Sequence, residues 1–358
     1  MVAQKHIHYL KIENFKSVKQ IDIKCKRINV FVGKPNVGKS NILEALSLLS
    51  RHGQIKDIIR FDKPFQLFYD NDDSKPLKIF TNLIATFIGQ RANSNSYDWY
   101  TGDIDFMELL YENYIKKSGD KFLSQYNESK NGLDIVNYPF TGSQLAFDGS
   151  LNLTRDTHTI KTVIKKYVFN ERLKSFENSF SSFLNTPDGD NLLTILTKSK
   201  KLRSEIASFF DEYGLEFLID QKENIFEIQK RVDGISYKYE YKFIADTLRR
   251  IIFYLSAIKS NKDSVLLFEE PEAHSFPPYI NRIAREMIDS ESNQFFIATH
   301  SPYLLSTLVE HCDYKDCAVF VAKYKDYQTE VKELTKKQIG EMLNYGTDVF
   351  INYEAFVD

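Results

Sequence analysis

The stretch Gly33-Lys34-Pro35-Asn36-Val37-Gly38-Lys39-Ser40 decides the fold of this chain. It follows the apolar run Ile28–Val32 and precedes residues 41–49, whose apolar side chains recur at helical spacing. This is the G-x-x-x-x-G-K-S phosphate loop between a strand and a helix, where backbone N–H groups and the positive helix end converge on one polyphosphate. A chance glycine-rich turn is a poor alternative for eight fixed positions in that setting. The loop therefore predicts binding of a nucleoside triphosphate with Mg2+.

Each residue type in the loop has a physical role. Gly33 and Gly38 let the backbone turn and approach the phosphates, and Lys39 would reach the outer phosphates. The Ser40 hydroxyl would ligate Mg2+. The predicted nucleotide-binding residues are Gly33, Asn36, Val37, Gly38, Lys39, Ser40 and Asn41, and Ser40 is also a predicted metal ligand.

The composition indicates a soluble globular protein. The 358 residues are 42% hydrophobic, enough for two or three domains with cores, and the formal net charge of −2 argues against a general polyanion binder. Residues 1–60 hold 12 Lys and Arg against 4 Asp and Glu, an excess that we interpret as a solvated face in preference to a DNA patch. Three scattered cysteines form neither a disulfide framework nor a zinc pattern. With no apolar leader and no run of 18 apolar residues, we expect a cytoplasmic protein without membrane contact.

The hydrophobic pattern predicts an α/β fold in three parts. Short alternating runs before the loop and Leu77–Phe87 predict strands. Residues 91–235 carry no catalytic motif, combine helical stretches at 106–115 and 192–210 with turn-rich segments, and end in short strands, so we expect a mainly helical inserted arm or lid there. The predicted division is 1–90 for an N-terminal lobe, 91–235 for the arm and 236–358 for a C-terminal lobe, with a mixed sheet flanked by helices.

Two carboxylates follow the continuous apolar run Val265–Phe268, which is typical of a buried parallel strand. Glu269 would hold Mg2+, and Glu270 would position or deprotonate the water that attacks ATP. The alternative is an exposed strand end without function. The carboxyl ends of strands are where open α/β sheets bind ligands, which favours the catalytic interpretation.

A histidine follows the next apolar run, Phe295–Ala298. A neutral imidazole at His300 would contact the γ-phosphate or the attacking water, so we predict Glu270 and His300 as the catalytic residues. A purely structural role is the alternative for His300 and the favoured one for His274. Lys39 and Glu269 are 230 residues apart (269 − 39), so one sheet must be completed by two distant segments with an insertion between them.

Four motifs together resemble the ABC-type ATPase heads of the SMC, RecF and OLD group, and most of all OLD-like, defence-associated ATPases. They are Asn14–Ser17, Gly33–Asn41, Glu269–Glu272 and Thr299–Tyr303. The resemblance covers residues 1 to about 90 and 240–358, and it implies a P-loop head of which two copies sandwich ATP. It gives Walker B roles to Glu269 and Glu270, a D-loop role to residues 271–274 and the switch-histidine role to His300.

The chain departs from the family pattern at three places. The dimer signature, normally a loop with Ser and Gly before a helix, reads Phe243–Thr247 here, with Thr247 or Arg249 as the candidate contact to the partner's nucleotide. Walker B begins with Glu269 where Asp is usual. Gln90 is the candidate for the Q-loop glutamine, at the end of a predicted strand.

The resemblance leaves three functions open. OLD nucleases carry a TOPRIM domain, for which the residues after Ser301 are too few, so we expect an ATPase head without its own nuclease. The first hypothesis is an ATP-hydrolysing homodimer, a sensor or motor subunit in anti-phage or toxin-antitoxin-like defence that signals to a separate nuclease or toxin. The alternatives are a RecF-like DNA-binding repair ATPase, for which nucleic acid is a partner, and a non-hydrolysing nucleotide switch that scaffolds a complex.

Overall fold

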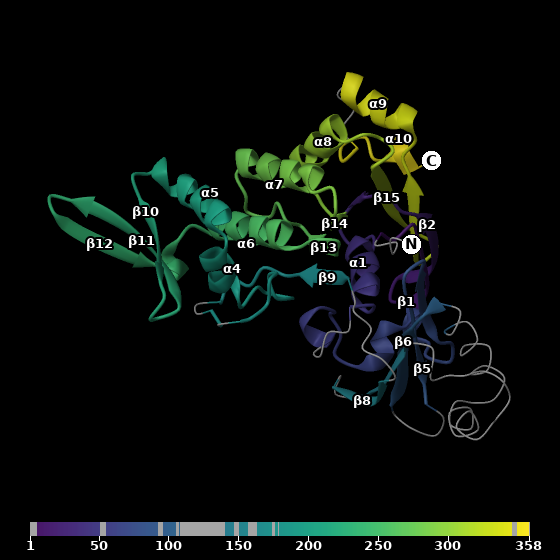
Figure 1. The fold of residues 1–358 in the computed structure, drawn as a ribbon. Coiled ribbons are helices and arrows are strands. Elements are labelled where there is room, and N and C mark those ends of the chain that lie inside the picture. Colours follow the sequence, from purple (N-terminus) through teal and green to yellow (C-terminus); the bar gives the residue numbers. More distant parts are fainter. Residues whose placement is uncertain are drawn as a thin grey trace.

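A six-stranded sheet forms the centre of the molecule (Figure 1). The computed structural model describes residues 6–50, 55–91, 96–104, 107, 140–146, 150–156, 163–173, 176–177, 179–345 and 349–357. The strand order is β16-β15-β3-β14-β13-β9, in which the last five strands run parallel and β16 pairs antiparallel with β15. The strands are β3 (Ile28–Val32), β9 (Ile164–Tyr167), β13 (Val265–Glu269), β14 (Gln294–Ala298), β15 (Cys317–Lys325) and β16 (Gln328–Glu333). Two distant chain segments thus complete one sheet, as the motif spacing predicts.

Both faces of this sheet are buried, which is why its central strands are continuous apolar runs. Leu266 and Phe268 of β13 point into one hydrophobic cluster, and Val265 and Leu267 point into the other. The first cluster is covered by helices from the second half of the chain, and the second lies against α1 and a further sheet. The helices are α1 (Lys39–Ser47), α4 (Leu192–Lys198), α5 (Lys200–Asp211), α6 (Asp246–Ser260), α7 (Pro277–Asp289), α8 (Pro302–His311), α9 (Lys336–Tyr345) and α10 (Glu354–Val357).

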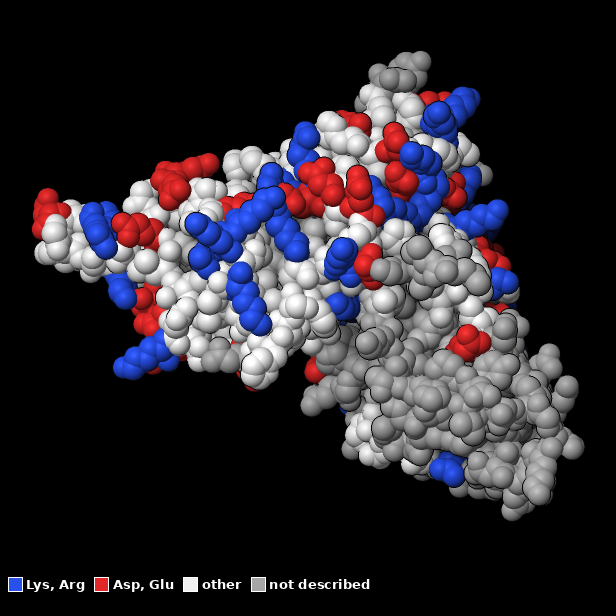
Figure 2. All heavy atoms as spheres, in the orientation of Figure 1, with Lys and Arg blue, Asp and Glu red and all other residues white. Residues whose placement is uncertain are grey.

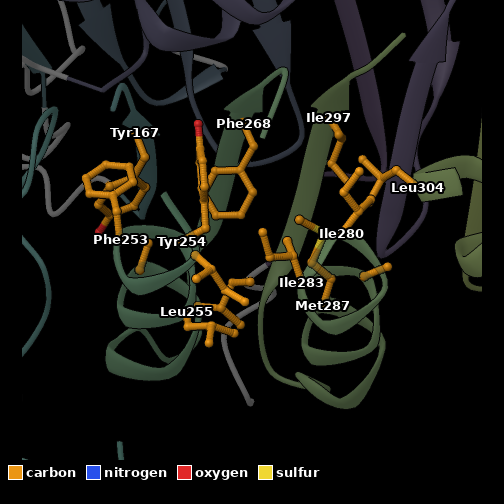
Figure 3. Close-up of a cluster of buried hydrophobic side chains, with 14 of the residues drawn as sticks. Tyr167, Phe253, Tyr254, Leu255, Phe268, Ile280, Ile283, Met287, Ile297 and Leu304 are labelled. Atoms are coloured by element: carbon orange, nitrogen blue, oxygen red, sulfur yellow. The ribbon is translucent and has the colours of Figure 1, made fainter. Parts of the chain in front are cut away.

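Aromatic rings hold α6 against the sheet (Figure 3). Phe268 on β13 lies edge-on to Tyr254 of α6, with ring centroids 5.2 Å apart, and to Tyr167 of β9 at 6.0 Å. Ile283 and Met287 of α7 fill the neighbouring space beside β14 (Figure 3). Edge-to-face pairs stabilise the fold beyond the free energy that comes from burying apolar area. The strand that ends in Glu269 is therefore held in place along its length.

The second sheet has seven antiparallel strands in the order β2-β1-β4-β5-β6-β7-β8. They are β1 (Tyr9–Phe15), β2 (Val18–Lys24), β4 (Leu77–Thr81), β5 (Ala85–Gln90), β6 (Tyr97–Gly102), β7 (Phe140–Leu145) and β8 (Leu151–Asp156). Short 3-10 helices, η1 (Ile55–Asp57), η2 (Pro64–Leu67) and η3 (Tyr69–Asn71), connect α1 to β4. The single strand expected over Leu77–Phe87 is a hairpin, because Thr81 Oγ1 donates to Ile84 O at 2.7 Å and closes a turn there.

Residues 91–235 differ from the mainly helical arm that the sequence favours. Within the described residues, β6, β7 and β8 extend the seven-stranded sheet and β9 belongs to the central sheet. Of the other described elements in this stretch, α4 and α5 pack against α6, and the three-stranded sheet of β10 (Glu216–Asp220), β11 (Ile225–Val232) and β12 (Ile235–Glu240) projects from the body (Figure 1). The expected helical stretch at 106–115 lies almost entirely outside the described residues. The division at residues 90 and 235 stays a prediction, although residue 90 falls between two paired strands, β5 and β6.

The described helices are too short or too polar to cross a membrane.

Candidate nucleotide-binding and hydrolysis site

The phosphate loop connects β3 to α1 as predicted. Gly33 and Gly38 have φ angles of 146° and 96°, values that side chains with a Cβ rarely adopt. Neighbouring strands also pack closely against the loop. A Cβ on Gly38 would lie 2.0 Å from Thr329 Oγ1, and a Cβ on Gly33 would lie 2.4 Å from Ala322 O. Both glycines are therefore required by space as well as by backbone angle.

A small hydroxyl network holds the loop from behind. Thr329, fully buried on β16, donates from Oγ1 to Val37 O at 2.9 Å and contacts Ser17 Oγ at 2.6 Å. Asn41 Nδ2 on α1 donates to the same Ser17 oxygen at 2.7 Å. Asn41, predicted to bind nucleotide, thus holds the turn between β1 and β2 in this structure.

Gly38→Ala is expected to lower the free energy of unfolding by about 2–3 kcal/mol, because the methyl group adds overpacking to backbone strain. Gly214→Ala is the matched control, since Gly214 also has a positive φ of 64° but nothing within 4 Å of the added Cβ. Chemical denaturation of both variants measures the difference. Equal losses for the two variants would contradict close packing of Thr329 against the loop.

Lys39 caps the loop's own carbonyl groups. Its Nζ donates to Gly33 O and to Lys34 O, each at 2.9 Å. Burial lowers the pKa of Lys39 to about 8, against the opposing pull of nearby glutamates. A buried ammonium held by neutral carbonyls gains from an added polyanion, which is what the predicted phosphate contact requires.

Glu269, at the end of β13, lies among cations. Its Oε2 is 3.5 Å from Nζ of the buried Lys166 on β9, and its Oε1 is 3.4 Å from Nη2 of the exposed Arg60. Burial opposes ionisation, but Lys166, a hydrogen bond from Ser40 and Arg60 outweigh it and lower the pKa of Glu269. Glu269 is therefore an ionised carboxylate beside the Ser40 hydroxyl.

Glu270 and His300 lie at the ends of neighbouring strands. His300 Nε2 is 3.8 Å from Glu270 Oε1, and the Glu270 N–H donates to Ala298 O at 2.8 Å. Burial and the charge of Lys39 lower the pKa of His300 more than Glu270 raises it. The neutral imidazole of His300 thus faces the half-exposed carboxylate of Glu270. The carboxylate is suited to accept a proton, and the imidazole is suited to contact a phosphate.

These groups line one pocket of about 410 Å³. Its lining residues are Ser17, Pro35, Asn36, Gly38, Lys39, Ser40, Asn41, Arg60, Glu269, Glu270 and His300. The fold therefore brings together all predicted site residues except Gly33 and Val37, which are turned toward β15 and β16. A larger pocket of about 820 Å³, lined by Asp57, Asn170 and Asp188 among others, contains no predicted site residue.

Several functional neighbours have no local sequence signal. Arg60 donates to the buried Glu44 of α1 at 2.8 Å, and Lys16, in the motif Asn14–Ser17, pairs with the same glutamate. Lys166 donates to Ile58 O at 2.7 Å beside Glu269. An isolated basic residue in a strand or loop cannot be assigned to a site from sequence when its partner is distant in the chain. Arg60 and Lys166 lie 209 and 103 residues before Glu269 (269 − 60 and 269 − 166).

The candidates for the signature contact, Thr247 and Arg249, and for the Q-loop glutamine, Gln90, lie in different surroundings. Thr247 Oγ1, at the start of α6, donates to His274 O at 2.6 Å. Arg249 is buried and donates to Asp246 and to Glu171 O, so its guanidinium is held inside this subunit. Gln90, at the end of β5, does not line the 410 Å³ pocket.

The donor set fits Mg2+. Mg2+ prefers oxygen ligands and commonly takes one or two protein oxygens together with substrate phosphates. The Ser40 hydroxyl and the ionised Glu269 carboxylate both line the pocket at the mouth of the phosphate loop. These two side chains would hold the ion.

Comparisons with known proteins agree with this geometry. Endonuclease GajA of Bacillus cereus (strain VD045) is 25% identical over 338 residues, which are 82% of this chain and 55% of GajA. The DNA replication and repair protein RecF of Clostridium kluyveri is 41% identical over 63 residues, 16% of this chain and 17% of RecF. The chain spans about half the length of GajA.

The fold has a solved counterpart. The crystal structure of an SMC head bound to the C-terminal winged-helix domain of ScpA has a TM-score of 0.50 at 12% identity, covering 94% of this chain and 99% of that one. Residues 6–305 match the AAA_15 family, described as an AAA ATPase domain. The chain therefore belongs to the AAA ATPase domain family, and its fold is similar to that of an SMC head.

Proposed function

We propose that this protein hydrolyses ATP with Mg2+ as a homodimer and passes its nucleotide state to a separate effector. The observation that carries the proposal is the single pocket in which the phosphate loop, Glu269, Glu270 and His300 meet. Phosphoryl transfer to water needs positioning and charge stabilisation more than covalent chemistry, and this pocket supplies both from fixed elements.

The residues divide the work by their chemistry. The N–H groups of the loop and Lys39 bind and orient the outer phosphates. Glu270 orients the attacking water and accepts its proton, and the neutral imidazole of His300 donates to the γ-phosphate or to that water. Ser40 and Glu269 would hold Mg2+, which when bound neutralises charge on the phosphate oxygens.

Two copies facing each other across ATP are supported by the surface beside the site. Phe276 precedes α7 and Tyr303 lies in the first turn of α8, and their side chains are 60% and 58% exposed. Both positions follow the strand ends that carry the catalytic residues. Large apolar side chains at the rim of a site are suited to a protein contact. Thr247, next to His274, is the proposed contact to the partner's nucleotide.

The resemblance of the four motifs to OLD-like, defence-associated ATPases supports a role in bacterial anti-phage or toxin-antitoxin-like defence, with a nuclease or toxin as the effector. A cytoplasmic location is part of the same proposal. GajA is named an endonuclease, whereas the site described here contains the groups for ATP chemistry. In this proposal, a separate nuclease or toxin responds to the nucleotide state.

Phosphate release from ATP, measured with and without Mg2+, tests the enzymatic part. Light scattering with and without ATP measures the mass of the complex, and mass spectrometry identifies what co-purifies. We expect Mg2+-dependent turnover and a doubling of mass with ATP. Tight ATP binding without turnover would instead identify a non-hydrolysing nucleotide switch.

A DNA-binding repair ATPase is the second candidate, favoured by the similarity to RecF. Figure 2 shows basic side chains over α5, α6 and α7, but acidic ones lie among them. Lys259 lies 2.7 Å from Glu205 and 3.1 Å from Glu286, so part of this charge is paired. An ATP-stimulated, salt-dependent gel shift with duplex DNA would support this candidate, and no shift at low salt would reject it.

A further inference from the structure

The side chain of Glu272 turns back from the segment after β13 to the end of β14. Its Oε1 accepts a hydrogen bond from Thr299 Oγ1 at 2.6 Å and another from the backbone N–H of His300 at 2.9 Å. Thr299 is fully buried. One carboxylate oxygen therefore joins two chain segments 27 residues apart, at the residue that carries the catalytic imidazole.

The other oxygen of Glu272 has no hydrogen-bond partner among the described residues, although it is buried. Removing a carboxyl oxygen from water without a partner costs free energy, and burial raises the pKa of this group. A surface glutamate would avoid that cost by rotating into solvent. The two hydrogen bonds that Oε1 accepts, from Thr299 and from the His300 N–H, therefore keep the Glu272 side chain turned inward.

The segment that Glu272 anchors has an unfavourable backbone. Glu270 and His274, two residues to either side, have positive φ angles of 45° and 55°, which cost free energy in residues other than glycine. Thr247 fixes the far side through His274 O. Without Glu272, the hydrogen bond that still joins the near side to the end of β14, among the described residues, is that from Glu270 N–H to Ala298 O.

We propose that Glu272 is a positioning residue for hydrolysis, because its carboxyl ties residues 270–276 to the end of β14 and so sets the spacing between Glu270 and His300. This proposal rests on the proposed ATPase function. Glu272 does not line the 410 Å³ pocket, so it acts through His300 and Glu270 and not on the nucleotide.

Glu272→Ala removes the acceptor, and Glu272→Gln keeps an oxygen that can accept both bonds. Because a displacement of about 1 Å at a site can cost roughly 10²-fold, we expect kcat to fall about 10²-fold in Glu272→Ala, with KM for ATP nearly unchanged. Glu272→Gln should restore kcat to within about threefold of the wild type, because hydrogen-bond geometry is preserved. If Glu272 were needed only for folding, its substitution would lower the melting temperature but would not lower kcat selectively while leaving KM unchanged.

The second measurement does not require hydrolysis. NMR of 13C-labelled histidine follows the protonation of His300, assigned with His300→Gln. The midpoint should move in Glu272→Ala and match the wild type in Glu272→Gln. If the wild type releases no phosphate, the ATPase proposal fails while this titration still tests the anchor. Equal midpoints in all three proteins would reject the anchor.

A full kcat in Glu272→Ala, or a folded Glu272→Gln as slow as Glu272→Ala, would also overturn the proposal. If Glu272→Ala does not fold, Glu272→Asp replaces it. Its carboxylate is one methylene shorter and cannot keep both bonds, so its kcat should fall below that of Glu272→Gln.

Discussion

Glu270→Gln is expected to lower kcat for ATP hydrolysis by about 10²–10⁴-fold, the usual range for loss of a general base. Glutamine has the size of glutamate but cannot accept a proton at neutral pH. Glu270 lies beside His300, and among the described residues no hydrogen bond or ion pair joins its side chain to the phosphate loop, so affinity for ATP should stay close to that of the wild type. Phosphate release and equilibrium binding of a fluorescent ATP analogue measure the two effects separately.

Glu310→Gln is the matched control for Glu270→Gln. The Glu310 side chain on α8 is 52% exposed and that of Glu270 is 51% exposed, but Glu310 lies outside the pocket. Glu310→Gln should hydrolyse ATP at the wild-type rate. Unchanged turnover in Glu270→Gln would remove Glu270 from the reaction and favour a water-activating role for His300 alone.

Lys39→Met should weaken ATP binding by more than about 10²-fold, with loss of turnover as the consequence. Methionine keeps the unbranched length but carries no charge. A hydrogen bond to a charged group contributes about 1.5–3 kcal/mol, and every 1.4 kcal/mol is tenfold in affinity, so two lost phosphate contacts account for this change. Isothermal titration calorimetry with ATP measures it directly.

Lys39 also contacts Gly33 O and Lys34 O, so the fold of the variant needs its own measurement. The melting temperature of Lys39→Met without nucleotide separates a misfolded loop from a lost phosphate contact. Lys337→Met, at a side chain that is 87% exposed on α9, controls for the loss of a positive charge and should bind ATP normally. Wild-type affinity in a folded Lys39→Met would contradict the assignment of the loop.

Local patterns predicted most of the candidate site. The phosphate loop could be read because its glycines, Lys39 and Ser40 are contiguous, and the loop lies between a strand and a helix as expected. Glu269, Glu270 and His300 could be placed because each follows an apolar run, and parallel neighbouring strands bring their carboxyl ends to one edge. Their individual roles stay predictions until the variants are measured.

Patterns over longer stretches predicted less. The alternation of apolar residues over Leu77–Phe87 continues through the turn, because Leu83 in the turn also packs against the core. The period of two therefore did not reveal two separate strands. In residues 91–235, turn-rich segments between apolar runs suggested an arm, but β6 to β9 pair with strands of two sheets. Which strands pair with each other depends on residues that are distant in the chain, and the pattern of a single segment does not contain that information.

The sequence by itself determined that this chain has a phosphate loop and that two distant segments complete one sheet, since contiguous residues and the spacing of motifs carry that information. Only the tertiary structure decided that Thr329 and Ser17 support the loop, that Lys166 and Arg60 hold Glu269 ionised, and that Glu272 joins the segment after β13 to His300. Hydrogen bonds and charge interactions act over a few ångströms in space, whereas these partners are separated by up to 312 residues along the chain.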